Sequence, residues 1–181
     1  MKLGCLFSTL LLLLTTGSSY AEVPNKSVNV SDLKILSVSH GGYTIGGKPA
    51  SDIYFGLDDN NYCAITFAPS EMEKEKSKKG QDIYVAYRNS SNKNPYIDIT
   101  CQWSSATFLL SSKEIHDCHA SLAIFDLDPK EKTATIVFTY KLLNIATANF
   151  PPEKLAYLNF PKYALKISES DFTELGLEIF N

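Results

Sequence analysis

The stretch His116-Asp117-Cys118-His119 is the densest group of side chains that could do chemistry. Imidazole, carboxylate and thiolate groups all bind metal ions, but a stable zinc site needs three or four ligands in tetrahedral geometry. If these residues enter a strand, His116 and Cys118 point to one face and His119 to the other. An oxidised Cys118 would have no thiolate to offer. The pattern therefore favours a pair of loop histidines beside a disulfide, and we expect no bound metal or cofactor.

The sequence contains no recognisable pattern of catalytic residues of another kind. A serine nucleophile needs a base and a third residue that orients the base, and the chain has no Gly-x-Ser-x-Gly elbow. Carboxylate pairs for glycoside hydrolysis could be drawn from several residues that are mostly typical of turns, namely Asp58, Asp59, Asp98, Asp126 and Asp128. We expect a non-catalytic protein and keep, as the alternative, a small secreted hydrolase or metal-binding protein that uses His116 and His119.

Tyrosines suggest a recognition role. Four of them fall on the predicted solvent sides of their strands: Tyr54, Tyr62, Tyr84 and Tyr96. Exposed tyrosine is enriched at binding surfaces because it offers a large area with little entropy to lose, although it also has a high β-propensity. The one tryptophan, Trp103, is predicted in the core. We therefore hypothesise that the protein binds another protein or a surface component.

The cysteines indicate one disulfide and one free thiol. Cys63, Cys101 and Cys118 follow the N-terminal segment, and export would place them where disulfides persist. Cys101 and Cys118 enclose about 17 residues, so closing that loop could contribute roughly 3 kcal/mol. We expect this pair to be bonded. A bridge from Cys63 to either of the other two, or no bridge, remains the alternative.

The first residues have the three parts of a secretory signal. Lys2 supplies a positive charge, residues 6–14 form an apolar run, and the following small and polar residues end at Ala21. A spanning helix needs about 20 apolar residues, roughly twice this run. We expect cleavage after Ala21, a polar leader over 22–31 and a secreted or periplasmic location.

The composition is that of one folded domain, predicted over 32–181. Hydrophobic residues make up 44% of the chain and aromatic residues 12%, which is enough for a core and unlike a disordered chain. The formal net charge of −3 argues against nucleic acid as a partner, because phosphate backbones usually require a basic patch. No second apolar stretch is long enough to span a bilayer.

Alternation of apolar and polar residues is the strongest structural signal. It predicts strands at 53–57, 62–67, 96–103 and 175–179, and at 82–88 with Ile83, Val85 and Tyr87 facing inward. The clearest hairpin runs over 120–142, with turn chemistry at Asp128-Pro129. About nine or ten such strands predict a mainly antiparallel all-β fold, a β-sandwich, with an antiparallel barrel as the alternative.

Two short helices are predicted among the strands. Ser70 and Glu73 form a capping-box pattern, and Gly80 could end that helix. The second helix is predicted to begin at Pro151-Pro152 and to run to about Leu158.

Overall fold

The computed structural model describes residues 32–89 and 91–180, and the predicted signal peptide (1–21) and leader (22–31) lie outside that part. The described chain is all-β and mainly antiparallel, as the sequence predicts. The strands are β1 (Lys34–Ile45), β2 (Lys48–Asp58), β3 (Asn61–Phe67), β4 (Glu73–Lys76), β5 (Asp82–Asn89), β6 (Ile97–Trp103), β7 (Ala106–Leu109), β8 (His119–Asp128), β9 (Thr133–Asn144) and β10 (Tyr157–Ile167). The short helices are η2 (Pro69–Glu71), η3 (Glu114–His116), η4 (Ile145–Thr147), η5 (Pro152–Lys154), α1 (Glu169–Glu174) and η6 (Leu177–Phe180).

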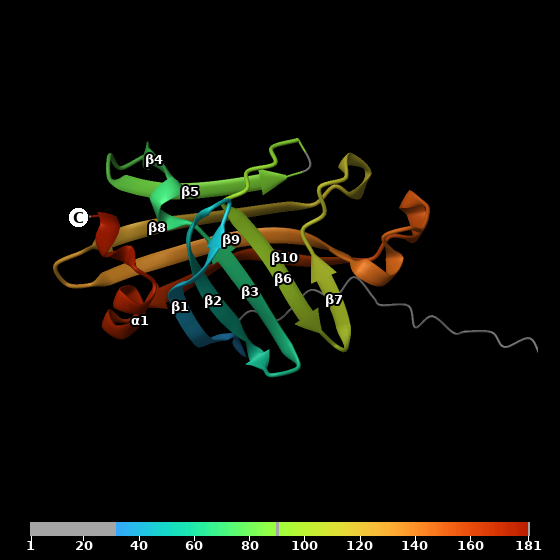
Figure 1. Ribbon diagram of the computed structural model, residues 1–181, viewed down its shortest axis with the longest axis horizontal. Coiled ribbons are helices and arrows are strands. Elements are labelled where there is room, and N and C mark those ends of the chain that lie inside the picture. Colours follow the sequence, from blue (N-terminus) through green and yellow to red (C-terminus); the bar gives the residue numbers. More distant parts are fainter. Residues whose placement is uncertain (1–31, 90, 181) are drawn as a thin grey trace, which may run out of the picture.

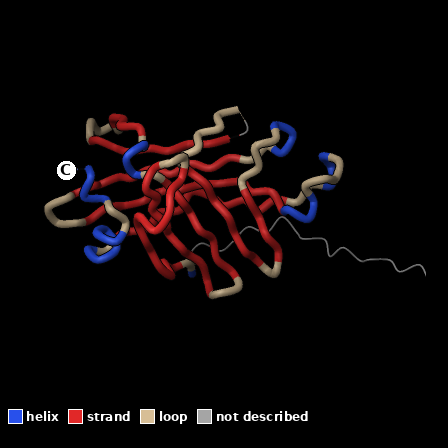
Figure 2. The backbone as a smooth tube through the Cα atoms, viewed as in Figure 1, coloured by secondary structure: helices blue, strands red, loops and turns tan. Residues whose placement is uncertain are grey.

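The ten strands form one hydrogen-bonded sheet that folds over itself into two layers (Figures 1 and 2). The first layer has the order β1-β2-β3-β6-β7 and the second the order β10-β9-β8-β5-β4. The far end of β9 joins them, because Leu143 and Asn144 pair with β7. The sheet is not closed, which fits the predicted sandwich rather than the alternative barrel. None of the helices in the described part has the length and apolar character needed to cross a membrane.

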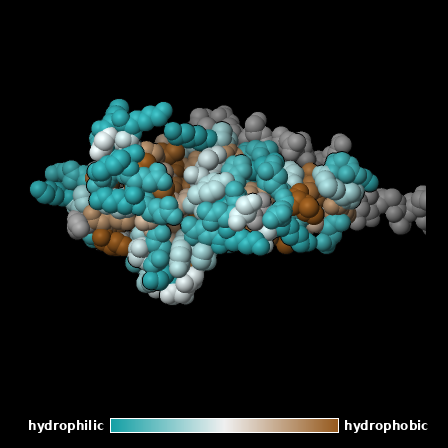
Figure 3. All heavy atoms as spheres, turned by 90° about the horizontal axis from the view of Figure 1, so that it is seen from above, coloured by the Kyte–Doolittle hydropathy of each residue, from teal (hydrophilic) through white to brown (hydrophobic). Residues whose placement is uncertain are grey.

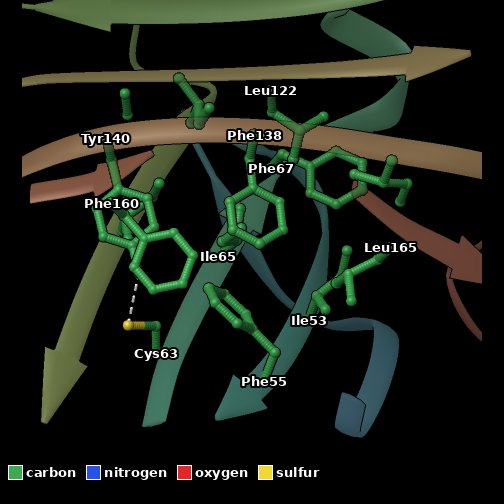
Figure 4. Close-up of a cluster of buried hydrophobic side chains, with 14 of the residues drawn as sticks. Ile53, Phe55, Cys63, Ile65, Phe67, Leu122, Phe138, Tyr140, Phe160 and Leu165 are labelled. Atoms are coloured by element: carbon green, nitrogen blue, oxygen red, sulfur yellow. Dashed lines mark hydrogen bonds between the residues drawn. The ribbon is translucent and has the colours of Figure 1, made fainter. Parts of the chain in front are cut away.

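The core lies between the inner faces of the two layers (Figure 4). Its centre is aromatic: the rings of Phe55 and Phe138 lie 4.6 Å apart, and those of Tyr140 and Phe160 4.7 Å apart. All four side chains are at most 2% exposed. Trp103 is 7% exposed, as predicted for a core residue. Such residues alternate along each strand, so one side of every layer is dry.

Alternation predicts the buried face correctly in β3 and β6 but not in β5. Ala86 and Tyr84 of β5 face the core, whereas Tyr87 is 42% exposed. The reason is the pairing with β8, where Ala86 lies opposite the fully buried Leu122. Residues opposite each other on neighbouring strands point to the same side of the sheet. Both sides of β5 are partly apolar, so the buried side of β8 decides which side of β5 faces the core.

The helix predicted from Ser70 to Gly80 is wrong. Only the single turn η2 forms, and residues Glu73–Lys76 become strand β4, which pairs with β5. An isolated helix with one large apolar residue gains little from packing, whereas β4 extends the sheet by backbone hydrogen bonds. Its four charged residues are all exposed, which protects this edge from pairing with other chains. Figure 3 views the molecule from the β4–β5 side and shows a mostly hydrophilic surface there.

The strand predicted at 175–179 is also wrong. The Ser168 side chain accepts a hydrogen bond from the Asp171 backbone and starts helix α1. Gly176 then ends it with φ +65°, a conformation that other residues avoid. Leu175 and Leu177 are nevertheless fully buried, as the alternation predicts, whereas the third apolar residue of the pattern, Ile179, is 49% exposed. The helix predicted from Pro151 is one turn, η5, before β10 begins.

The predicted Cys101–Cys118 bridge is wrong, because the disulfide joins Cys63 to Cys101. These two residues lie directly opposite each other on the adjacent strands β3 and β6, with Cα atoms 4.0 Å apart. Both side chains face the core and are fully buried. Strand pairing, rather than a short separation in sequence, therefore determines which cysteines bond. It places two cysteines that are 38 residues apart within bonding distance.

Candidate functional site

The His116-Asp117-Cys118-His119 stretch does not assemble into a site. His116 is 1% exposed, its Nδ1 lies 2.5 Å from Ser111 Oγ, and its Nε2 is buried without a hydrogen-bond partner in the described part of the chain. His119 instead begins strand β8, opposite Asn89 and Lys141. Within residues 32–89 and 91–180, no three His, Cys, Asp or Glu side chains gather closely enough to hold a metal ion.

Cys118 is the free cysteine of the described part, and it is buried. Burial raises the pKa of its thiol, so the thiol stays protonated at neutral pH and is a poor nucleophile. The sulfur donates a hydrogen bond to the His116 carbonyl at 3.4 Å. These contacts are those of a packed thiol that supports the loop between β7 and β8.

The outer side of the first layer carries a different group of side chains, which we call the tyrosine face. It consists of Tyr43 from β1, Asp52 and Tyr54 from β2, and Tyr62 and Thr66 from β3. Asp52 pairs with Thr66, and Gly56 pairs with Tyr62, so these side chains leave the sheet on one side. The rings of Tyr54 and Tyr62 are 6.3 Å apart, and Tyr43 and Tyr54 are 46% and 36% exposed.

An irregularity in β1 brings Tyr43 onto this face. The register between β1 and β2 shifts between His40 and Thr44. Gly41 has φ +77° within that segment, in the region that favours glycine. Bulges of this kind bend an edge strand and change the direction of a side chain. Here the result is that the Tyr43 hydroxyl reaches β2 and β3 and hydrogen-bonds to Asp52.

Hydroxyl groups rather than a basic side chain hold the Asp52 carboxylate. The carboxylate is 1% exposed although it lies on the outer side of the layer. Tyr43 donates to Oδ1, Thr66 donates to Oδ1 at 2.6 Å, and Ser39 donates to Oδ2 at 3.5 Å. A buried carboxylate is costly unless it is hydrogen-bonded, so these donors make the burial tolerable. In return the carboxylate fixes the Tyr43 ring, which is a preorganised aromatic surface.

The row continues across β6 with a second carboxylate. Asp98 lies opposite Thr66, and the Arg88 guanidinium from β5 binds Asp98 Oδ1 at 3.3 Å. Partial burial raises the pKa of Asp98, and the Arg88 charge opposes that shift. Arg88 also donates to the Ile97 carbonyl at 3.2 Å. The tyrosine face therefore has a charged border on its β6 side.

The four tyrosines that are predicted on the solvent sides of their strands lie in different environments. Tyr54 is exposed, and Tyr62 is half-buried beside it on the tyrosine face. Tyr84 instead packs against Phe180 in a tilted ring contact, with ring centroids 4.0 Å apart. Tyr96 is half-buried against the β1–β2 turn. Sequence reasoning missed Tyr43 as a site residue, although the adjacent Gly41-Gly42 was a signal of an irregular strand.

Tyr43 should titrate at unusually high pH. Burial and the hydrogen bond to Asp52 raise its pKa to about 12. A folded-state pKa above the unfolded value of about 10 favours the protonated form in the fold, so this contribution to stability is complete below pH 10 and is lost as the pH rises through 12. NMR of protein labelled with ¹³C at tyrosine Cζ should show a midpoint near 12 for the signal that Tyr43→Phe removes. Asp52→Asn should lower that midpoint, and an unchanged midpoint would contradict the contact.

The arrangement can bind but lacks an assembled nucleophile. It offers two exposed aromatic rings, one of them fixed by a buried carboxylate, next to hydroxyl groups and an ion pair. Rings and hydrogen-bonding groups in one plane are the chemistry of recognition surfaces. Comparisons of the chain with models of protein families, with curated proteins and with solved structures found no match.

Proposed function

We propose that the chain is an exported, non-catalytic β-sandwich that acts by binding a protein or another surface component, and that the tyrosine face carries the contact. The observation that carries this proposal is the pair Tyr43 and Tyr54, which are large, exposed rings on a rigid sheet. Tyrosine side chains at such positions lose little entropy on binding. The Cys63–Cys101 disulfide supports export, because disulfides persist in oxidising compartments.

A protein is the partner that this surface favours. The tyrosine face is one side of a sheet, so the aromatic rings are presented side by side rather than within a deep cavity. Protein interfaces are enriched in tyrosine and arginine, with polar groups at the rim, and here Arg88 and Asp98 occupy such a border. Because Asp52 fixes Tyr43 before binding, less ordering is required when the partner arrives.

The alternative of a small hydrolase or metal-binding protein depends on His116 and His119 acting together. In the described part of the chain, the hydrogen bond of the His116 ring is to Ser111, and the ring is buried. The described residues show no contact between the two imidazole rings that would support this alternative, whereas the tyrosine face supports binding.

Photo-crosslinking tests the proposal. A benzoylphenylalanine residue replaces Tyr54 on the tyrosine face or, as the matched control, Tyr87, which is 42% exposed on the outer side of the second layer. Irradiation in cells of the source organism should produce a discrete adduct from position 54 that the control position does not give. Protease should destroy the partner portion of the adduct, and adding Tyr43→Ser should reduce its yield severalfold.

Two results would overturn the proposal. Equal adducts from positions 54 and 87, or none from either, would remove the tyrosine face as the contact surface. An adduct that withstands protease but disappears on glycosidase treatment would identify a saccharide and contradict the protein partner.

A further inference from the structure

A pocket of about 320 Å³ lies on the second layer, away from the tyrosine face. Its walls come from β5, from the end of β8 with the following turn, and from η6, which lies beside those strands in Figure 1. The apolar lining residues are Tyr84, Leu127, Pro129 and Phe180, and the carboxylates are Asp82 and Asp126. A pocket of this size is at the lower end of the range for small ligands.

Two aromatic rings in contact, with their planes tilted by 37°, form one wall. Phe180 and Tyr84 have ring centroids 4.0 Å apart. The fully buried Leu175 and Leu177 anchor the segment that carries Phe180. The Lys74 ammonium group lies 5.8 Å from the centre of the Tyr84 ring, a distance at which cations are attracted to aromatic rings. The edge of this aromatic wall is therefore already in contact with one cation, the Lys74 ammonium group.

The two carboxylates of the pocket are in different situations. Asp82 accepts ion pairs from Lys74, at 2.8 Å, and from Lys76, so its charge is matched. Asp126 is exposed and has no ion pair with any other described residue. It lies where the register between β8 and β9 shifts, with φ +48°, which directs this residue out of the regular ladder. One negative charge in the pocket is thus available to a ligand.

We propose that this pocket binds an alkylammonium group, either of a small amine or of a lysine side chain. Aromatic rings next to an unpaired carboxylate are the chemistry that recognises organic cations, and Leu127 and Pro129 suit the alkyl part. The unpaired Asp126 carboxylate disfavours anions. A metal ion would need three or more ligating side chains, and the described residues contain no such group.

The test uses NMR titration of the ¹⁵N-labelled protein with named probes. Choline, a quaternary ammonium ion, represents a small alkylammonium ligand, and Nα-acetyl-lysine methylamide represents a lysine side chain. The uncharged choline analogue 3,3-dimethylbutanol is the ligand control. At least one of the two cations should shift the amide signals of residues 81–84, 126–129 and 177–180, and should bind about tenfold more tightly than the uncharged analogue. The tighter of the two cations identifies the source of the group.

Two matched variants assign the effect to the pocket. Asp126→Asn removes the unpaired charge and should weaken cation binding about threefold, whereas Asp59→Asn makes the same change in net charge in the β2–β3 turn and should leave binding unchanged. Phe180→Leu keeps apolar volume and should weaken binding by a similar factor through the loss of the ring. Equal binding of the uncharged analogue, shifts outside the pocket, or no shifts with either cation would overturn the proposal. Because this site and the tyrosine face are on different layers, the failure of one leaves the other standing.

Discussion

Replacing Cys63 and Cys101 together by alanine is expected to lower the free energy of unfolding by about 4 kcal/mol. The disulfide closes a sequence separation of 38 residues, for which the loss of loop entropy in the unfolded chain is about 4 kcal/mol. The two sulfur atoms are also fully buried, so their removal leaves space in the core. The effect is large against a total stability of about 5–15 kcal/mol for a domain.

Urea unfolding followed by tryptophan fluorescence measures this change, since Trp103 is in the core two residues after Cys101 on β6. The control is Cys118→Ala, which removes a buried sulfur but leaves the bridge intact and should cost only about 1 kcal/mol. Peptide mapping without reduction should recover Cys63 linked to Cys101 and a free thiol at Cys118. A peptide linking Cys101 to Cys118, or equal losses in the two variants, would contradict the observed pairing.

Phe138→Ala is expected to cost about 3–5 kcal/mol, the range for removing a large aromatic side chain from a core. Phe138 is 1% exposed and lies among the aromatic rings of both layers. Its ring centroid is 4.6 Å from that of Phe55 and 5.9 Å from that of Phe160. Its loss would leave a cavity between β9 and β2 at the centre of the sandwich, and neighbouring side chains could fill only part of it.

Tyr140→Phe is the matched control, because it keeps a ring in the same cluster. The Tyr140 hydroxyl is buried 2.9 Å from Cys63 Sγ, the contact drawn in Figure 4. Sulfur is a weak hydrogen-bond acceptor, so removing this hydroxyl should change the unfolding free energy by less than about 1 kcal/mol. Urea midpoints at an unchanged m-value provide the comparison. If Phe138→Ala were as mild as Tyr140→Phe, the position of the core between the layers would be wrong.

The class of fold follows from the sequence because its signal is local. In β3 and β6, every second side chain is apolar, and Ile65 and Ile99 are fully buried as this pattern predicts. The same local information places the β8–β9 hairpin around Asp128-Pro129. It fails where the pattern is weak or ambiguous, as at Glu73–Lys76 and in the choice of which side of β5 is buried. In both segments a neighbouring strand decided the conformation.

The candidate sites depend on contacts between distant parts of the chain. Tyr43 and Thr66 are 23 residues apart, yet both hydrogen-bond to Asp52. Phe180 reaches Tyr84 only because η6 folds back onto β5.

The sequence by itself determined that the described chain is built from one-sided strands around an aromatic core, since that information repeats every two residues. Only the tertiary structure decided which strands became neighbours. The pairing of the strands set the disulfide partner of Cys101, the burial of Asp52 and the side of β5 that faces the core. The physical reason is that apolar alternation specifies which side of a strand is dry, but it does not specify the strand that lies beside it.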